Sequence, residues 1–315
     1  MALPRYRMTL TILRIGILLL LVTGLPGAVT VAQTPVPVGL DSLRSRIVRL
    51  LAGQQGHFAV VFRDLSSPRA LEINSQEVFH AASTMKLAVM IELYRQRKQR
   101  RLSWRDSLDI HSGFRSIVDG SPYQLDSADD SETELYRHLG ERRSLGQLVY
   151  LMITLSSNLA TNLLMERVGA DQVMKTLRVL GTRRMQVLRG VEDNKAFERG
   201  LNNTVSADDL ALLLEKMARG ELVSRRASRR MVRILLDQRF NEIIPAGLPP
   251  GVRVAHKTGS ITGVEHDAGI VLLPDGREYV LVLLSRDLQD PASAVRTLAE
   301  VSRQVYLYYT GQEGG

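Results

Sequence analysis

The sequence predicts a mixed α/β fold of the α+β kind, in which an antiparallel sheet is built from both chain ends and flanked by helices. Two observations predict it. Apolar, β-branched runs within residues 57–73 and 252–285 are bounded by turn residues, as strands are. Between them, residues 87–245 show mainly the 3.6-residue apolar spacing of helices. We therefore expect one lobe from residues 33–86 and 246–315, and an inserted all-helical lobe from residues 87–245.

The first 32 residues are typical of a secretory signal peptide. Arg5, Arg7 and Arg14 stand before or beside an apolar run at residues 15–22, and small residues suited to cleavage follow Pro26. The apolar run is shorter than the roughly 20 residues that span a bilayer, which disfavours the alternative of a retained membrane anchor. We expect cleavage, no stable membrane insertion, and a periplasmic or secreted mature protein.

The N-terminal part of the lobe begins with an amphipathic pattern over residues 40–51, where Leu43 and Ile47 share one stripe, so a helix is expected there. Strands are expected at residues 57–62 and near residues 71–73, joined by a turn at Pro68.

The C-terminal part mirrors this pattern. Strands are expected at residues 252–257, 268–273 and 279–285, and Pro274-Asp275-Gly276 should turn the last two into a hairpin. Residues 291–309 are expected to form a closing helix. In the middle of the chain, the acidic stretch at residues 126–134 is expected to be an exposed loop.

Composition excludes several classes of function. The chain of 315 residues is 44% apolar with a net charge of +8, as in a globular protein, and its arginines form no basic stripe interleaved with aromatics, so nucleic-acid binding is not expected. It has no cysteine, which excludes disulfides, lipoprotein attachment and cysteine-ligated metals. Its six histidines lack a zinc spacing such as H-E-x-x-H, so we expect neither a metal nor a cofactor. We also expect the protein to be a monomer.

The first polar motif is S-x-x-K at Ser83 and Lys86. Ser83 opens an apolar helix, and the N–H groups at a helix N-terminus favour developing negative charge, which suits a nucleophile. Lys86 lies one turn further along on the same face and can act as base if its pKa is lowered by burial and by a second cation. The alternative is a plain helix N-cap with a solvated lysine.

The second and third motifs are S-x-N at Ser156 and Asn158, and K-T-G beginning at Lys257. Ser156 and Asn158 stand on a short turn between two apolar helices, where polar groups need partners, although capping of the second helix is an alternative. The K-T-G motif is expected to end a strand, where Gly259 lets a substrate approach the sheet edge. Lys257 is the candidate second cation; an edge strand meeting a turn is the alternative.

These three motifs in this order resemble those of class A β-lactamases and penicillin-binding proteins, and the resemblance extends from about residue 40 to the end. It implies a β-lactamase/transpeptidase-like fold. It also implies that Ser156 relays a proton to the leaving nitrogen and that Asn158 binds the substrate amide. Lys257 and Thr258 would bind a substrate carboxylate, and the N–H groups of Ser83 and of Ser260 or a neighbour would hold the oxyanion.

The resemblance further implies a general base for deacylation on a loop between the second and third motifs. Glu192 stands where that glutamate should fall, and Glu198 is the competing candidate. Class A loops carry an asparagine four residues beyond the glutamate, but here that position is Ala196, with Asn194 two residues on instead. A surface glutamate without a catalytic role is the alternative.

There are three further departures from the class A pattern: the first is tolerable, because its side chain should point away from substrate, and the other two bear on substrate range. The middle residue of S-x-N, often Asp, is Ser157; an insertion covers roughly residues 103–134; and Ala268 replaces an arginine after K-T-G. The insertion could reshape the cleft mouth. Beside Ala268, His266 is expected to be an ordinary turn histidine, with contact to substrate as the alternative.

The resemblance implies a serine β-lactamase that hydrolyses a small-molecule β-lactam through an acyl-serine intermediate. A D-alanyl-D-alanine peptidase acting on peptidoglycan stem peptides would share all three motifs without requiring Glu192. A penicillin-binding sensor domain that acylates without turnover is a third reading.

Overall fold

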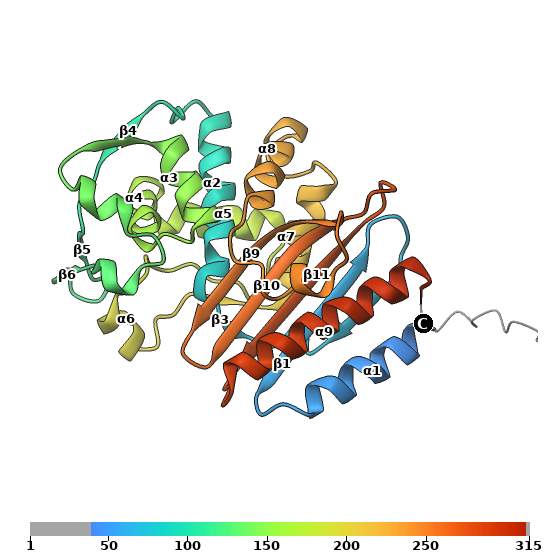
Figure 1. Ribbon diagram of the computed structural model, residues 1–315. Helices are drawn as coiled ribbons and strands as arrows, with labels where there is room; N and C mark the ends of the chain where they lie inside the picture. Colours follow the sequence, from blue (N-terminus) through green and yellow to red (C-terminus); the bar gives the residue numbers. More distant parts are fainter. Residues whose placement is uncertain (1–38, 313–315) are drawn as a thin grey trace, which may run out of the picture. The chain divides into compact units, whose positions relative to one another are not determined.

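The computed structural model describes residues 39–312, and the predicted signal peptide at residues 1–32 lies outside this range. A five-stranded antiparallel sheet in the order β2-β1-β11-β10-β9 forms its centre (Figure 1). The strands are β1 (His57–Asp64), β2 (Ala70–Ile73), β9 (Arg253–Ile261), β10 (Val264–Leu272) and β11 (Glu278–Arg286). The prediction of one sheet built from both chain ends is confirmed.

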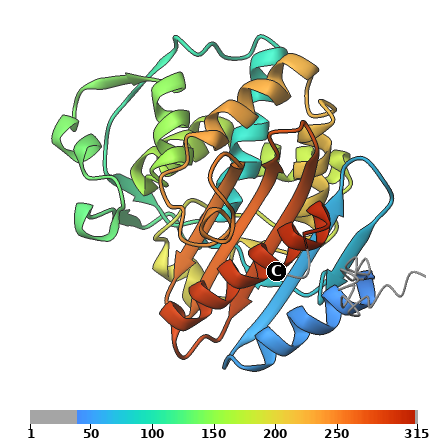
Figure 2. The same ribbon diagram turned by 45° about the vertical axis from the view of Figure 1, so that its right-hand side comes forward.

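Two cores lie on the two faces of this sheet. Helices α1 (Leu40–Ala52) and α9 (Pro291–Thr310) cover one face, side by side in both views (Figures 1 and 2). On the other face, α7 (Ala207–Ala218) packs on β1, β10 and β11, and α8 (Arg225–Leu236) packs on β9. Because successive strand side chains point to opposite faces, Phe62 of β1 joins the first core and its neighbour Val61 joins the second.

The segment between the sheet's two halves is mainly helical, as expected, but not all-helical. Its helices include α2 (Lys86–Lys98), α3 (Leu145–Thr154), α4 (Asn158–Val168), α5 (Ala170–Leu180) and α6 (Asn194–Glu198). Three short pairs of strands accompany them: β3 (Phe79–His80) with β8 (Thr204–Val205), β4 (Ser107–Asp109) with β7 (Arg142–Ser144), and β5 (Gly113–Arg115) with β6 (Pro122–Gln124). Strands of two or three residues are too short to leave a period-2 pattern in the sequence.

The acidic stretch at residues 126–134 is mostly exposed, as predicted, but two of its carboxylates are buried. Asp130 and Glu132 are buried, with only 8% and 6% exposure. Their carboxylates accept backbone N–H groups, those of Glu134 and Leu135 in the case of Glu132, which starts the short 3₁₀ helix Glu134–His138. Charged groups can be buried when such donors replace water, and the sequence pattern does not show where the donors are.

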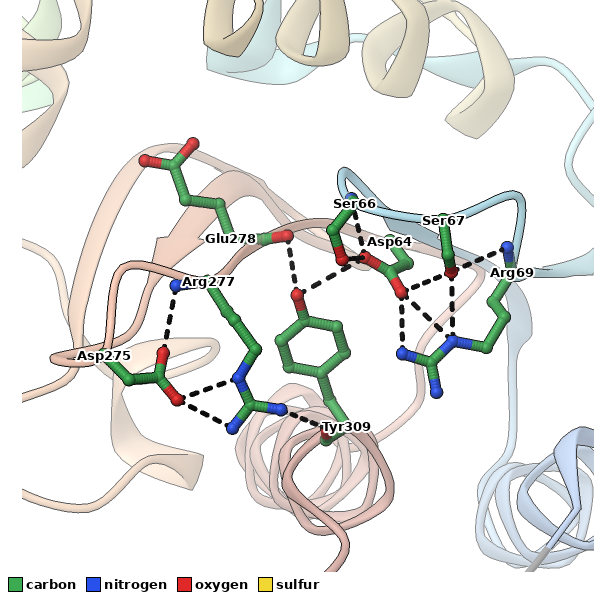
Figure 3. Close-up of polar contacts among 8 residues, drawn as sticks. All are labelled: Asp64, Ser66, Ser67, Arg69, Asp275, Arg277, Glu278 and Tyr309. Carbon is green, nitrogen blue, oxygen red and sulfur yellow. Dashed lines mark hydrogen bonds and ion pairs between the residues drawn. The ribbon is translucent and has the colours of Figure 1, made fainter.

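Polar contacts fix the last turn of α9 to the start of β11 (Figure 3). The hydroxyl of Tyr309 donates to the carbonyl of Glu278 at 3.0 Å, and Arg277 Nη1 donates to the carbonyl of Tyr309 at 3.2 Å. Beside them, Asp64 at the end of β1 accepts bonds from Ser67 and Arg69. The closing helix is therefore held at its C-terminal end by specific bonds as well as by apolar packing. Within the described part of the chain, no helix has both the length and the apolar character needed to cross a membrane.

Candidate active site

Ser83 lies on a 3₁₀ turn, Ala82–Met85, that runs directly into α2. It is half-buried and lines two adjoining cavities of about 390 and 660 Å³. The preceding residue, Ala82, has a φ of 43°, which is rare for a residue with a side chain. Strained backbone of this kind persists only where the surroundings hold it, and it clusters at functional sites.

Lys86 is fully buried beneath this turn. Its Nζ donates to the carbonyl and hydroxyl oxygens of Ser156 and, at 2.9 Å, to Oδ1 of Asn158. Burial lowers the pKa of Lys86 to about 7, against the opposing influence of the carboxylates of Asp130 and Glu192. The side chain can therefore exchange a proton near neutral pH, as a general base must.

Ser156 occupies the turn between α3 and α4 with a φ of 56°. Its hydroxyl oxygen also accepts a bond from Lys257 Nζ at 3.0 Å, so two lysines meet at one serine. Lys257 is buried as well, and burial together with the charge of Lys86 keeps its pKa well below the usual range. Ser156 is thus placed to pass a proton between buried amines.

The prediction that the K-T-G motif ends a strand is wrong, because the motif lies inside strand β9. Strand β9 continues to Ile261, which pairs with Val264 across a tight turn. Gly259 lies against the 3₁₀ turn that carries Ser83: a Cβ at that position would be 3.1 Å from the backbone nitrogen of Ser83. Beyond it, the exposed Ser260 donates its hydroxyl to Glu265 at 2.9 Å.

Glu192 lines the smaller cavity together with Ser83. Its Oε1 accepts a bond from Asn158 Nδ2 at 3.2 Å, and its φ is 61°. Burial and the nearby carboxylate of Asp129 raise the pKa of Glu192, while Lys86 opposes them. The competing candidate, Glu198, is exposed on α6 and is not part of the walls of either cavity. The structure therefore brings Glu192, and not Glu198, to the cavity that Ser83 lines.

Asn162 is a residue of this site that sequence reasoning missed. Its Oδ1 accepts the backbone N–H of Val191 at 2.7 Å, and its Nδ2 donates to the carbonyl of Val191 at 3.0 Å. The side chain is buried on α4, one turn after the S-x-N motif. It holds the residue before Glu192 by both backbone groups. A buried asparagine within an apolar helix was the available signal, since such a side chain needs partners.

The two ends of the loop that carries Glu192 are joined by hydrogen bonds of Arg189 and Asn203. Asn203 Oδ1 accepts the N–H of Leu188 at 2.8 Å, and its Nδ2 donates to the carbonyl of Arg189 at 2.9 Å. Arg189 Nε donates across to the carbonyl of Leu201 at 3.0 Å. The result is a compact Ω-loop, whose close ends and internal bonds make it a defined structure.

The inserted segment at residues 103–134 contacts this Ω-loop directly. Asp193, next to Glu192, accepts the hydroxyl of Ser116 at 2.8 Å and the N–H of Ile117 at 2.9 Å. Lys195 Nζ binds Asp119 at 3.0 Å. Asp129 and Ser131, from the same segment, line the larger cavity. The insertion therefore both forms part of the cleft wall and braces the loop behind it.

The prediction that His266 is a turn histidine is wrong, because it lies within strand β10. It has no exposed surface, and both ring nitrogens are occupied: Nε2 donates to the carbonyl of His80 at 2.9 Å, and Nδ1 accepts the N–H of Ser285 at 3.1 Å. Its neighbour Asp267 accepts the N–H of Ile244 at 3.0 Å. His266 also stands among the residues that line the larger cavity, so its alternative role in contact with substrate stays open. Among residues 39–312, no cluster of His, Asp or Glu side chains could hold a metal ion.

A half-buried serine at a helix start, a buried lysine, and a second serine between two lysines define a serine hydrolase of the acyl-transfer type. The chain belongs to the beta-lactamase enzyme family, whose model matches residues 42–309. It is a serine β-lactamase-like hydrolase.

Solved structures agree with this assignment. A β-lactamase from Sphaerobacter thermophilus DSM 20745 is 26% identical, with a TM-score of 0.73 over 88% of this chain and 100% of that chain. The protein PBP-A is 28% identical, with a TM-score of 0.73 over 88% of this chain and 99% of that chain, and a mutant of PBP-A has been solved as an acyl-enzyme complex with penicillin G. The TLA-1 extended-spectrum β-lactamase, 20% identical over 86% of this chain and 99% of that chain, shares the fold with a TM-score of 0.74.

Proposed function

We propose that this protein is a serine β-lactamase of class A type, which hydrolyses the amide of a β-lactam and acts in the periplasm or after secretion. The observation that carries the proposal is the position of Glu192. Its carboxylate lines the same cavity as Ser83 and is bonded to Asn158, which in turn contacts Lys86. A carboxylate of raised pKa beside an acyl-serine is suited to activate water.

The acylation half-reaction uses the two lysines and Ser156. Lys86 takes the proton of Ser83, whose Oγ then bonds to the lactam carbonyl carbon. The oxyanion that forms is held by the N–H groups of Ser83 and Ser260. Gly259, which precedes Ser260 in the chain, lies close in space to the backbone nitrogen of Ser83. The lactam C–N bond breaks, and the nitrogen receives a proton through the Ser156 hydroxyl, which accepts bonds from Lys86 and Lys257.

The substrate is bound by residues of β9 and by Asn158. Thr258, Gly259 and Ser260 line the larger cavity opposite Asn158, so a substrate amide and carboxylate can lie between strand and turn. In deacylation, Glu192 takes a proton from water, the water oxygen bonds to the acyl carbon, and the ester bond to Ser83 breaks. The proton returns to the serine oxygen.

A second candidate function, a penicillin-binding peptidase or sensor that deacylates slowly, is favoured by one observation. The position four residues beyond Glu192 is Ala196, which is fully buried and has no polar side chain to hold a water molecule. The similarity to PBP-A also fits this candidate. Its substrates would be peptidoglycan stem peptides.

The deciding experiment is intact-protein mass spectrometry over time, after mixing the mature protein with a penicillin or a cephalosporin. We expect a mass gain at Ser83 that disappears as hydrolysed drug accumulates. Glu192→Gln should keep the gain and trap it, whereas Glu198→Gln, on the exposed face of α6, should behave as wild type. A persistent gain in the wild type would instead support the peptidase or sensor. The N-terminal residue of the exported protein tests the signal peptide.

A further inference from the structure

The start of helix α4, which carries Asn158, is held by a carboxylate from a distant part of the chain. Asp130 accepts the backbone N–H of Asn158 at 3.0 Å on Oδ1 and at 2.9 Å on Oδ2, and its Oδ2 accepts the N–H of Leu159 at 2.9 Å. The hydroxyl of Tyr136 donates to the same oxygen at 3.1 Å. Asp130 is buried, so these bonds replace its hydration.

The first three N–H groups of α4 are thereby satisfied by two different residues. Such groups have no partner within the helix and need a cap. Ser157, the N-cap residue, accepts only the third, from Ala160 at 3.1 Å. The first two, from Asn158 and Leu159, bond to Asp130. A serine hydroxyl at the N-cap commonly accepts one such N–H, so the turn depends on a carboxylate from elsewhere.

Asp130 belongs to the inserted segment at residues 103–134, and it is bonded to the start of α4, which carries Asn158. We propose that Asp130 is the positioning residue of the S-x-N turn, a carboxylate that fixes the backbone of Asn158 and adds its negative charge to that of Glu192 near the buried amine of Lys86. This inference rests on the proposed function. It gives the insertion a part in acylation through Asp130, in addition to its contact with the Ω-loop through Asp193.

The charge of Asp130 acts on Lys86 together with its other neighbours. Lys86 faces the carboxylate of Glu192 on the Ω-loop and the amine of Lys257 on β9, and its direct bonds go to the neutral Ser156 and Asn158. Asp130 and Glu192 raise the pKa of Lys86 against its burial. Removal of the charge of Asp130 would lower that pKa further, so neutral Lys86 would persist to lower pH.

The test compares Asp130→Asn with wild type and with Glu134→Gln, which removes a charge from an exposed side chain of the same region. The second-order rate of covalent labelling by a penicillin is measured by mass spectrometry from pH 5 to 9, with circular dichroism to check folding. For Asp130→Asn, we expect the plateau rate to fall at least tenfold and the midpoint of the acid limb to move to lower pH. Glu134→Gln should keep both wild-type values.

The pH profile separates positioning from a purely structural role. If the plateau labelling rate of Asp130→Asn falls but the midpoint of its acid limb does not move, Asp130 has only a structural role and the proposal is overturned. A rate and a midpoint that both match wild type would also overturn it. If Asp130→Asn does not fold, Asp130→Glu carries the test: it keeps the charge but displaces the oxygens, so the midpoint should stay and the rate should fall. A wild-type rate in Asp130→Glu would overturn the proposal. A wild-type protein that is not labelled at all would instead refute the proposed function.

Discussion

Lys86 and Lys257 donate to the same acceptor, the hydroxyl oxygen of Ser156, at 3.3 and 3.0 Å. Two buried amines that share one oxygen cannot both hold their protons easily, because like charges at short range in a poorly solvated site repel. The charge of Lys86 is indeed one cause of the lowered pKa of Lys257. The pair can therefore carry one mobile proton, and Ser156 is the group through which that proton can move.

Lys86→Met should remove the base for acylation. General-base catalysis contributes roughly 10²- to 10⁴-fold, so we expect the rate of penicillin labelling at Ser83 to fall by at least about 100-fold. The matched control is Lys98→Met at the exposed end of the same helix, which should label at the wild-type rate. Mass spectrometry over time measures both. Rapid labelling of Lys86→Met would show that another group deprotonates Ser83.

The wild-type labelling rate should depend on pH with a midpoint near neutrality. The pKa of Lys86 is about 7, so the amine becomes protonated and loses its function as a base when the pH falls through that value. We expect the rate to decline about tenfold for each pH unit below the midpoint, as for a single required base. A rate that stays constant down to pH 5 would contradict the assignment of Lys86 as base.

Asn162→Ala should separate acylation from deacylation. It removes the bonds to both backbone groups of Val191 and leaves the N–H unpaired, while the carbonyl keeps its bond from the Tyr123 hydroxyl, at a cost of about 1–3 kcal/mol in unfolding free energy. The hydrogen bonds of this side chain go to Tyr123 and Val191, and not to Ser83 or Lys86, so labelling should stay within about threefold of wild type, while release of the acyl group slows by at least tenfold. Chemical denaturation and the mass-spectrometric time course measure the two effects. Unchanged release would mean that the Ω-loop holds Glu192 without Asn162.

The sequence was sufficient to predict the sheet, because strands leave local patterns, whereas the convergence of the three motifs was inferred from their resemblance to a known family. The strand expected at residues 57–62 lies within β1, and the turn expected at residues 274–276 connects β10 to β11. The motif at Lys257 was misplaced by a few residues, since the ladder between β9 and β10 continues past Gly259. The roles of Ser83 and of Glu192 in catalysis stay predictions.

The parts that could not be predicted depend on contacts between distant segments. Asp130 and Asp193 look like ordinary surface acids in the sequence, because nothing local shows that their carboxylates meet the N–H groups of Asn158 and Ile117. The three-residue strands of the insertion carry no periodicity. Such a segment is placed by specific side-chain bonds, and a pattern of apolar spacing contains no information about them.

Gly259→Ala should distort the turn that carries Ser83. The new Cβ would lie 3.1 Å from the nitrogen of Ser83 and 3.2 Å from the side chains of Ala82 and Thr84, which is tighter than ordinary contact. Because Ala82 already has an unusual φ, the turn has little freedom to move away. We expect labelling to slow by at least tenfold. Gly113→Ala, where a Cβ meets no atom within 4 Å, is the control, and equal rates in the two variants would argue against close packing at Ser83.

His266 should make the folded state sensitive to mild acid. Burial lowers its pKa from 6.5 to about 4 in the folded protein, so between these values the unfolded chain binds a proton that the folded protein does not. Stability is then complete above pH 6.5 and is lost as the pH falls toward 4. At about 1.4 kcal/mol per unit of pKa difference, roughly 2 kcal/mol of this contribution is lost by pH 5.

Urea denaturation at pH 7 and pH 5 measures this loss. His266→Gln keeps a neutral donor in the strand and cannot gain a charge, so its stability should fall less between the two pH values than that of wild type. His57→Gln, which changes an exposed histidine on β1, should show the full wild-type loss. Equal losses in all three proteins would mean that His266 becomes protonated in place, with the hydrogen bond it accepts from Ser285 given up before the fold is lost.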